Sequence, residues 1–144
     1  MAEDSKINLK LTPGEILIVA GAIVTLVFSF LHFYTAPSPL SGGVSAWGKG
    51  LVPITTIIVL FTVVMGVQVV LTKLLSVDLG AGIAGFTWTQ VHVALGFFAT
   101  LDSLAFLVVS KGGAGIGIGL ILMLVGSAAC FAGAILLGNE RAKA

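Results

Sequence analysis

Four long apolar runs, separated by short segments rich in glycine, proline or serine, dominate the pattern of this chain. The runs cover residues 14–34, 53–75, 87–109 and 115–138. Each is close to the ~20 residues that a helix needs to cross ~30 Å of hydrocarbon. The pattern therefore predicts an all-α integral membrane protein, a single domain over residues 1–144 folded as a four-helix up-down bundle.

The first run begins with a helix-start signal. Thr12, Pro13 and Glu15 follow the order of a capping box, in which Thr12 accepts from a free backbone N–H and Glu15 reaches back to the cap. Pro13 falls at the first helical position, where its missing N–H costs nothing. We expect a structural role for Glu15 at the membrane surface rather than a catalytic or ion-binding one.

Composition agrees with a membrane protein and narrows its function. The chain is 58% hydrophobic and 9% charged, and its mean hydropathy is +1.17. The segments outside the apolar runs are too short to form a soluble domain with a conventional active site. The net charge is +1 and no basic stripe is present, so we expect the lipid bilayer, not nucleic acid, as a partner.

The basic residues predict an orientation. Placing both termini in the cytoplasm puts five basic side chains on that side and two, Lys49 and Lys111, on the other. The five are Lys6, Lys10, Lys73, Arg141 and Lys143. We therefore expect a multi-pass protein of the cell membrane with cytoplasmic N- and C-termini, in which a tight turn over Ser110–Gly113 joins the third and fourth helices.

Asp102 is the most distinctive polar residue, because it lies well inside the third apolar run. A carboxylate about seven residues from a helix end is roughly 10 Å inside the hydrocarbon and should face protein. Ser29 and Thr56 are expected at a similar depth, so a neutral Asp102 could donate to a hydroxyl or a carbonyl. The alternatives are a proton-handling or ion-binding role and a contact with a partner.

His92 and Gln68 form a second candidate intramembrane polar site. Each lies roughly 7 Å from the inner end of its helix, so an interhelical hydrogen bond between them is the simplest expectation. His92 also belongs to a stripe at helical spacing that looks like a packing face, made of residues 89, 92, 96, 100, 103 and 107. Asp102 points away from this stripe, so the two sites should serve different neighbours.

The two histidines could in principle hold a haem. Under the predicted topology, however, His32 lies at the outer end of the first helix, within an interfacial aromatic belt, and His92 lies near the inner end of the third. A separation of the order of 20 Å excludes one shared iron within the subunit. We therefore expect no cofactor and no metal within the subunit, and the remaining alternative is a haem or quinone shared with a partner subunit.

The fourth run carries many small residues. Its candidate packing face consists of Gly115, Gly119, Gly126, Cys130 and Gly133, of which the first two form a GxxxG pair. Such faces let helix backbones approach closely in lipid. This face could pack inside the bundle or in an oligomer.

Catalytic signatures are absent from the sequence. No metal-ligand cluster, nucleophile elbow, phosphate loop or carboxylate pair can be assembled, and the glycines of GGAGIGIG do not follow a strand. We therefore predict no catalytic residues and no enzymatic activity.

Three stretches carry a family resemblance: LTPGEILIVAGAIVTLVFSFLHFY at the start, SAWGKGL before the second run and GFTWTQVHVALGFFA at the third. In their order the chain resembles small actinobacterial four-helix integral membrane proteins of unknown function. The resemblance covers most of the chain and implies a bacterial inner membrane and a compact bundle. It implies no catalytic residues.

The sequence leaves three functions open. The first is a non-enzymatic structural or accessory subunit that assembles laterally, with itself or with other membrane proteins, through its glycine-rich faces. The second is an oligomeric channel or transporter component that uses Asp102. The third is a membrane anchor subunit of a redox complex.

Overall fold

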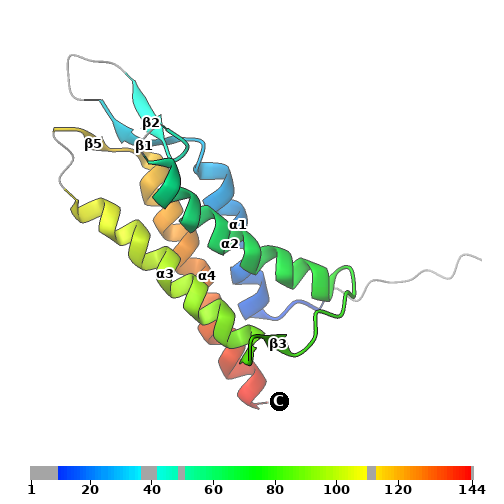
Figure 1. The fold of residues 1–144 in the computed structure, drawn as a ribbon. Helices are drawn as coiled ribbons and strands as arrows, with labels where there is room; N and C mark the ends of the chain where they lie inside the picture. Colours follow the sequence, from blue (N-terminus) through cyan, green and yellow to red (C-terminus); the bar gives the residue numbers. More distant parts are fainter. Residues whose placement is uncertain (1–9, 37–41, 49–50, 110–112, 144) are drawn as a thin grey trace, which may run out of the picture.

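The computed structural model describes residues 10–36, 42–48, 51–109 and 113–143, and within them the chain is mostly helical. Four helices are present in these residues: α1 (Pro13–Phe28), α2 (Val52–Lys73), α3 (Trp88–Val108) and α4 (Ile118–Lys143) (Figure 1). Three of them, α2, α3 and α4, are long and apolar enough to cross a membrane. At 16 residues, α1 is shorter.

The first helix ends earlier than the sequence predicted, at Phe28 rather than at residue 34. The chain turns there and continues as strand β1 (His32–Thr35), a segment rich in residues that favour extended structure. Phe33 of β1 is fully buried and packs edge-on against Phe106 of α3. This burial explains why the apolar run continues beyond the helix.

Two small sheets, which the sequence did not predict, lie between the helices. β1 pairs with β2 (Gly43–Ser45) and with β5 (Gly115–Ile116), both antiparallel. β3 (Gly82–Ile83) and β4 (Phe86–Thr87) form a hairpin. Its two turn residues, Ala84 and Gly85, both have positive φ, as the tight type I′ hairpin turn requires.

The position of β5 corrects the prediction for the fourth helix. Gly115 lies in a strand and α4 begins at Ile118, so Gly115 and Gly119 do not form a pair on one helix face. The glycines in this stretch weaken helix formation, and the backbone N–H of Gly117 donates to the carbonyl oxygen of Phe33 instead (2.9 Å). Of the predicted turn over Ser110–Gly113, residues 110–112 lie outside the described residues.

Each helix contacts two others closely: α1 lies against α2 and α4, and α3 lies against the same two helices. Two buried apolar clusters fill the space between them. One contains Ile18, Met65, Val69, Cys130 and Leu137, and the other contains Phe33, Ile58, Val59, Leu120 and Met123.

The closest helix contact joins α1 to α4 through glycines. A Cβ built on Gly14 would lie 2.8 Å from the carbonyl oxygen of Gly133, and one built on Gly133 would lie 2.7 Å from that of Gly14. Gly21 and Gly126 face each other in the same reciprocal way. The small-residue face of α4 therefore packs inward against α1.

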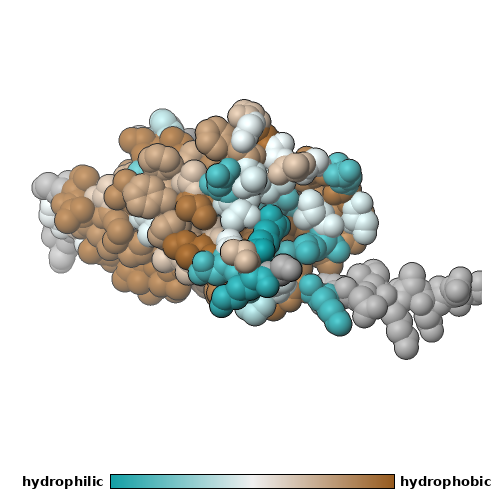
Figure 2. Space-filling view, turned by 90° about the horizontal axis from the view of Figure 1, so that it is seen from below, coloured by the Kyte–Doolittle hydropathy of each residue, from teal (hydrophilic) through white to brown (hydrophobic). Residues whose placement is uncertain are grey.

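The polar residues of the helix ends gather at the end of the molecule where α1 begins and α4 finishes. Figure 2, which views the molecule toward this end, shows hydrophilic residues clustered there and hydrophobic side chains along the flank. The basic residues Lys10, Lys73, Arg141 and Lys143 belong to this end. Lys6, Lys49 and Lys111, which also entered the orientation argument, lie outside the described residues.

Candidate functional site

Asp102 lies in an open groove between α2 and α3. The groove has a volume of about 480 Å³ and is lined by apolar side chains of both helices apart from the one carboxyl group. Phe61 of α2 and Phe98 of α3 contribute aromatic rings to it. Asp102 is partly exposed and makes no hydrogen bond or ion pair with any described residue.

The hydroxyls expected at the depth of Asp102 do not bond to it. Ser29 donates to the carbonyl oxygen of Leu26 (2.6 Å) and accepts from the indole N–H of Trp47 (3.0 Å). The Thr56 hydroxyl is buried and has no partner among the described residues. The carboxyl group of Asp102 thus faces the groove rather than a polar group of another described residue.

His92 is buried on the inner face of α3, with 1% of its surface exposed. Neither ring nitrogen has a hydrogen-bond partner among the described residues, so the expected bond with Gln68 is not formed. The imidazole lies 6.4 Å, between ring centroids, from the indole of Trp88 one turn earlier. Gln68 is also buried, on α2.

The predicted stripe of α3 that contains His92 lies against α4. His92, Gly96 and Ser103 are buried, together with Ala99, and the Ser103 hydroxyl lies 3.3 Å from that of Ser127 on α4. A Cβ on Gly96 would lie 2.8 Å from the Cα of Phe131. Asp102 is not on this face, so the two polar sites of α3 have different surroundings.

Charged residues connect the helix ends where α1 begins and α2 finishes. Glu15 is 2% exposed and completes the predicted capping box: its backbone N–H donates to the Thr12 hydroxyl and its carboxylate accepts from the Thr12 N–H. The same carboxylate lies 3.1 Å from the ammonium of Lys73 on α2. The capping box predicted for Thr12 and Glu15 is therefore confirmed.

Two residues of α4 reach the beginnings of other helices. Glu140 accepts from the backbone N–H of Gly14 (3.2 Å), where a negative charge complements the helix dipole. Arg141 donates to the hydroxyl of Thr89 on α3 (2.9 Å). These contacts explain why α4 continues to Lys143, beyond the predicted end at residue 138.

The opposite end is held by aromatic side chains. The Tyr34 hydroxyl donates to the carbonyl oxygen of Phe106 (2.8 Å), and partial burial raises the pKa of Tyr34 above its usual value. His32 lies at this end, in β1, and is exposed. The two histidines of the chain are therefore at opposite ends of the helices.

Two features of these sites were not predicted from the sequence. Thr87 and Gln90 form a second capping box at the start of α3, which the spacing Thr-x-x-Gln could have indicated. The rings of Phe61 and Phe98 beside Asp102 carried no comparable signal, because they come from different helices.

No group of three or more histidine, cysteine or acidic residues that could hold a metal occurs in the described part of the chain. Comparisons with protein-family models, with curated protein sequences and with solved structures found no match. The resemblance to small actinobacterial membrane proteins thus stays a prediction.

Proposed function

We propose that this chain is a non-enzymatic accessory subunit of a bacterial cell membrane, which assembles laterally with a second copy or another membrane protein. The proposed contact surface is the α2–α3 groove, and the observation that carries the proposal is the carboxyl group of Asp102. It lies on the outside of the helices, among apolar side chains, with no partner among the described residues.

The cost of such a group in lipid favours a protein neighbour. Asp102 is six residues from the end of α3, about 9 Å along the helix axis. Placing a polar group at this depth against hydrocarbon costs roughly several kcal/mol of free energy unless the group is hydrogen-bonded. A donor from a neighbouring helix would satisfy it.

The glycine-rich face of α4 does not serve this purpose. It is covered by α1 within the same chain, so it offers no surface to a partner. The proposed contact surface is therefore the groove of Asp102 and not the glycine-rich face of α4.

The proposed topology is an up-down bundle of four crossings with both termini in the cytoplasm. At 16 residues α1 is only about 24 Å long, which is short for a crossing. Its glycines, Gly14 and Gly21, pack directly against α4. If α4 crosses the membrane, α1 therefore lies within the membrane beside it. The basic residues Lys10, Lys73, Arg141 and Lys143 share one end, which by the positive-inside rule faces the cytoplasm.

Native mass spectrometry of the protein extracted in a mild detergent tests the assembly. We expect the wild type to appear as an oligomer or with a bound membrane protein, and Asp102→Leu to release monomer. Val125→Leu on the outer face of α4 is the matched control and should keep the complex, because Val125 is exposed away from the groove. A wild-type monomer without a partner would contradict the proposal.

A second candidate function follows from the aromatic rings beside Asp102. A carboxylate flanked by Phe61 and Phe98 in an apolar groove suits a lipophilic cation, so an oligomer of this chain could carry such a cation or a proton. Asp102→Asn should then abolish the flux of tetraphenylphosphonium or protons in reconstituted vesicles. Unchanged flux would remove this candidate.

A further inference from the structure

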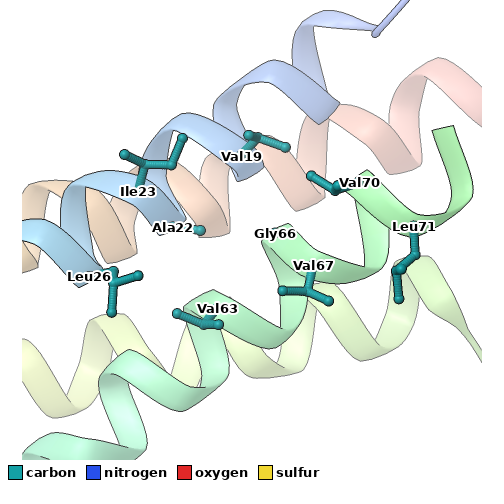
Figure 3. A pocket seen from close by; sticks show the side chains of 9 residues that line it. All are labelled: Val19, Ala22, Ile23, Leu26, Val63, Gly66, Val67, Val70 and Leu71. Carbon is teal, nitrogen blue, oxygen red and sulfur yellow. The ribbon is translucent and has the colours of Figure 1, made fainter. Parts of the chain in front are cut away.

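A second groove lies between α1 and α2, on a different side of α2 from Asp102. Its volume is about 220 Å³ and all of its lining residues are aliphatic or glycine. Figure 3 shows side chains of both helices along it, among them Val19, Ile23 and Leu26 of α1 and Val63, Val67 and Leu71 of α2. No hydrogen-bonding side chain of the described residues lines it, so it suits an apolar segment.

Two small residues form the floor of this groove. Gly66 of α2 faces Ala22 of α1, and a Cβ built on Gly66 would lie 2.7 Å from the Cβ of Ala22 (Figure 3). The larger side chains on either side of this contact stand along the rims. The rim residues Ile23 and Val67 are 57% and 48% exposed, so an extended chain could lie between them.

The groove ends on the side of the molecule to which Lys73 and Lys10 belong. The lining ends at Val70 and Leu71, close to Lys73, the last residue of α2, and Lys10 lies three residues before α1. Both lysines are exposed. Lys73 pairs with the buried Glu15, but an ammonium has three donors, so it retains N–H groups for another acceptor.

We propose that this groove holds one acyl chain of an anionic phospholipid, whose phosphate lies against Lys10 and Lys73. The aliphatic lining takes the hydrocarbon, and the two lysines complement the charge of the headgroup. A zwitterionic lipid offers the same hydrocarbon without the net charge, so it should bind less well. The inference rests on the proposed membrane location but does not involve the α2–α3 groove.

The test compares phosphatidylglycerol with phosphatidylcholine of the same acyl chains. Each is added to delipidated full-length protein in detergent, and bound lipid is counted by native mass spectrometry. We expect preferential retention of phosphatidylglycerol. Lys10→Gln should reduce that preference about fivefold, the effect of one surface lysine, whereas Lys143→Gln should not.

Filling the groove provides the second arm. Val67→Trp places a ring over the groove from its exposed rim and should abolish retention, while Val125→Trp on the exposed outer face of α4 should leave it intact. Equal retention of the two lipids, or full retention by Val67→Trp, would overturn the proposal. So would a disulfide cross-link between two copies of an Ile23→Cys variant, because a protein would then occupy the groove.

The outcomes separate this inference from the proposed assembly. Asp102→Leu should release monomer and still retain phosphatidylglycerol, whereas Val67→Trp should lose the lipid and keep the assembly. Failure of one proposal therefore leaves the other measurable.

Discussion

Gly21 of α1 and Gly126 of α4 lie so close that neither position has room for a side chain. A Cβ built on Gly21 would be 2.5 Å from the carbonyl oxygen of Gly126, and one on Gly126 would be 2.8 Å from that of Gly21. Lipid provides no hydrophobic drive between helices, so close backbone packing of this kind holds them together. The pair fixes the crossing of the first helix on the last.

Gly21→Ala should therefore destabilise the protein although alanine favours helices. The gain in helix propensity is about 1 kcal/mol, and overpacking against the backbone of α4 costs about 1–3 kcal/mol. We expect a net fall in the free energy of unfolding, measured by titration with sodium dodecyl sulfate in mixed micelles. Gly126→Ala should act similarly, and the double variant should be non-additive because both changes strain one contact.

Ala20→Leu is the matched control for this prediction. Ala20 is the neighbouring residue on α1 and is exposed, so a larger side chain there meets no backbone. Its free energy of unfolding should change by less than about 0.5 kcal/mol. A Gly21→Ala variant as stable as this control would contradict the close contact.

The Glu15–Lys73 pair gives a second prediction. Glu15→Gln keeps the size of the side chain but removes the charge that lies 3.1 Å from Lys73. Because Lys73 is half exposed, we expect a loss of only about 1 kcal/mol of unfolding free energy. A double-mutant cycle with Lys73→Met isolates the pair, and a coupling energy of zero would show that the pair contributes nothing.

The helices of this fold could be predicted from the sequence because they depend on local patterns. Apolar length predicted all four helices, and the spacing of Thr12 and Glu15 predicted the first capping box. The segments around His32 and Gly115 were predicted wrongly, because they form strands only through pairing with each other across the chain. Apolar composition cannot distinguish such a buried strand from a continued helix.

The candidate site could be predicted only in part, because its contacts join segments that are far apart in the sequence. Helical spacing placed Asp102 away from the stripe of His92, but partners depend on which helices are neighbours. Ser29 was expected near Asp102 by depth alone, and in the fold it bonds to Trp47. The face of Gly126 and Cys130 could have packed inward or outward, and only the contact with α1 decides this.

Tyr34 allows a direct measurement of its environment, because it is the only tyrosine in the chain. Burial disfavours the phenolate, so the pKa in the folded protein is raised above the unfolded value of about 10. The stabilisation from this group is therefore fully present below that value and is lost as the pH rises above it. Ultraviolet absorbance of the phenolate should show a midpoint above that of a model peptide.

Tyr34→Phe tests the hydrogen bond of the same residue. It removes the donor to the carbonyl oxygen of Phe106 and keeps the ring contact with Phe33. The free energy of unfolding should fall by about 1 kcal/mol at neutral pH, and the stability loss at high pH should become smaller. An unchanged stability together with an ordinary midpoint would place Tyr34 in water instead.

His92 provides the last prediction, because a buried imidazole without hydrogen bonds lowers stability. Its two ring nitrogens have no partner among the described residues, so His92→Leu removes two unsatisfied polar atoms from the inner face of α3. Removing an unsatisfied group should preserve or raise the free energy of unfolding, by up to about 1–3 kcal/mol. His32→Leu, at an exposed position, should change it little. A clear loss of stability in His92→Leu alone would mean that the imidazole has a bound partner, such as a buried water or a group of a neighbouring subunit.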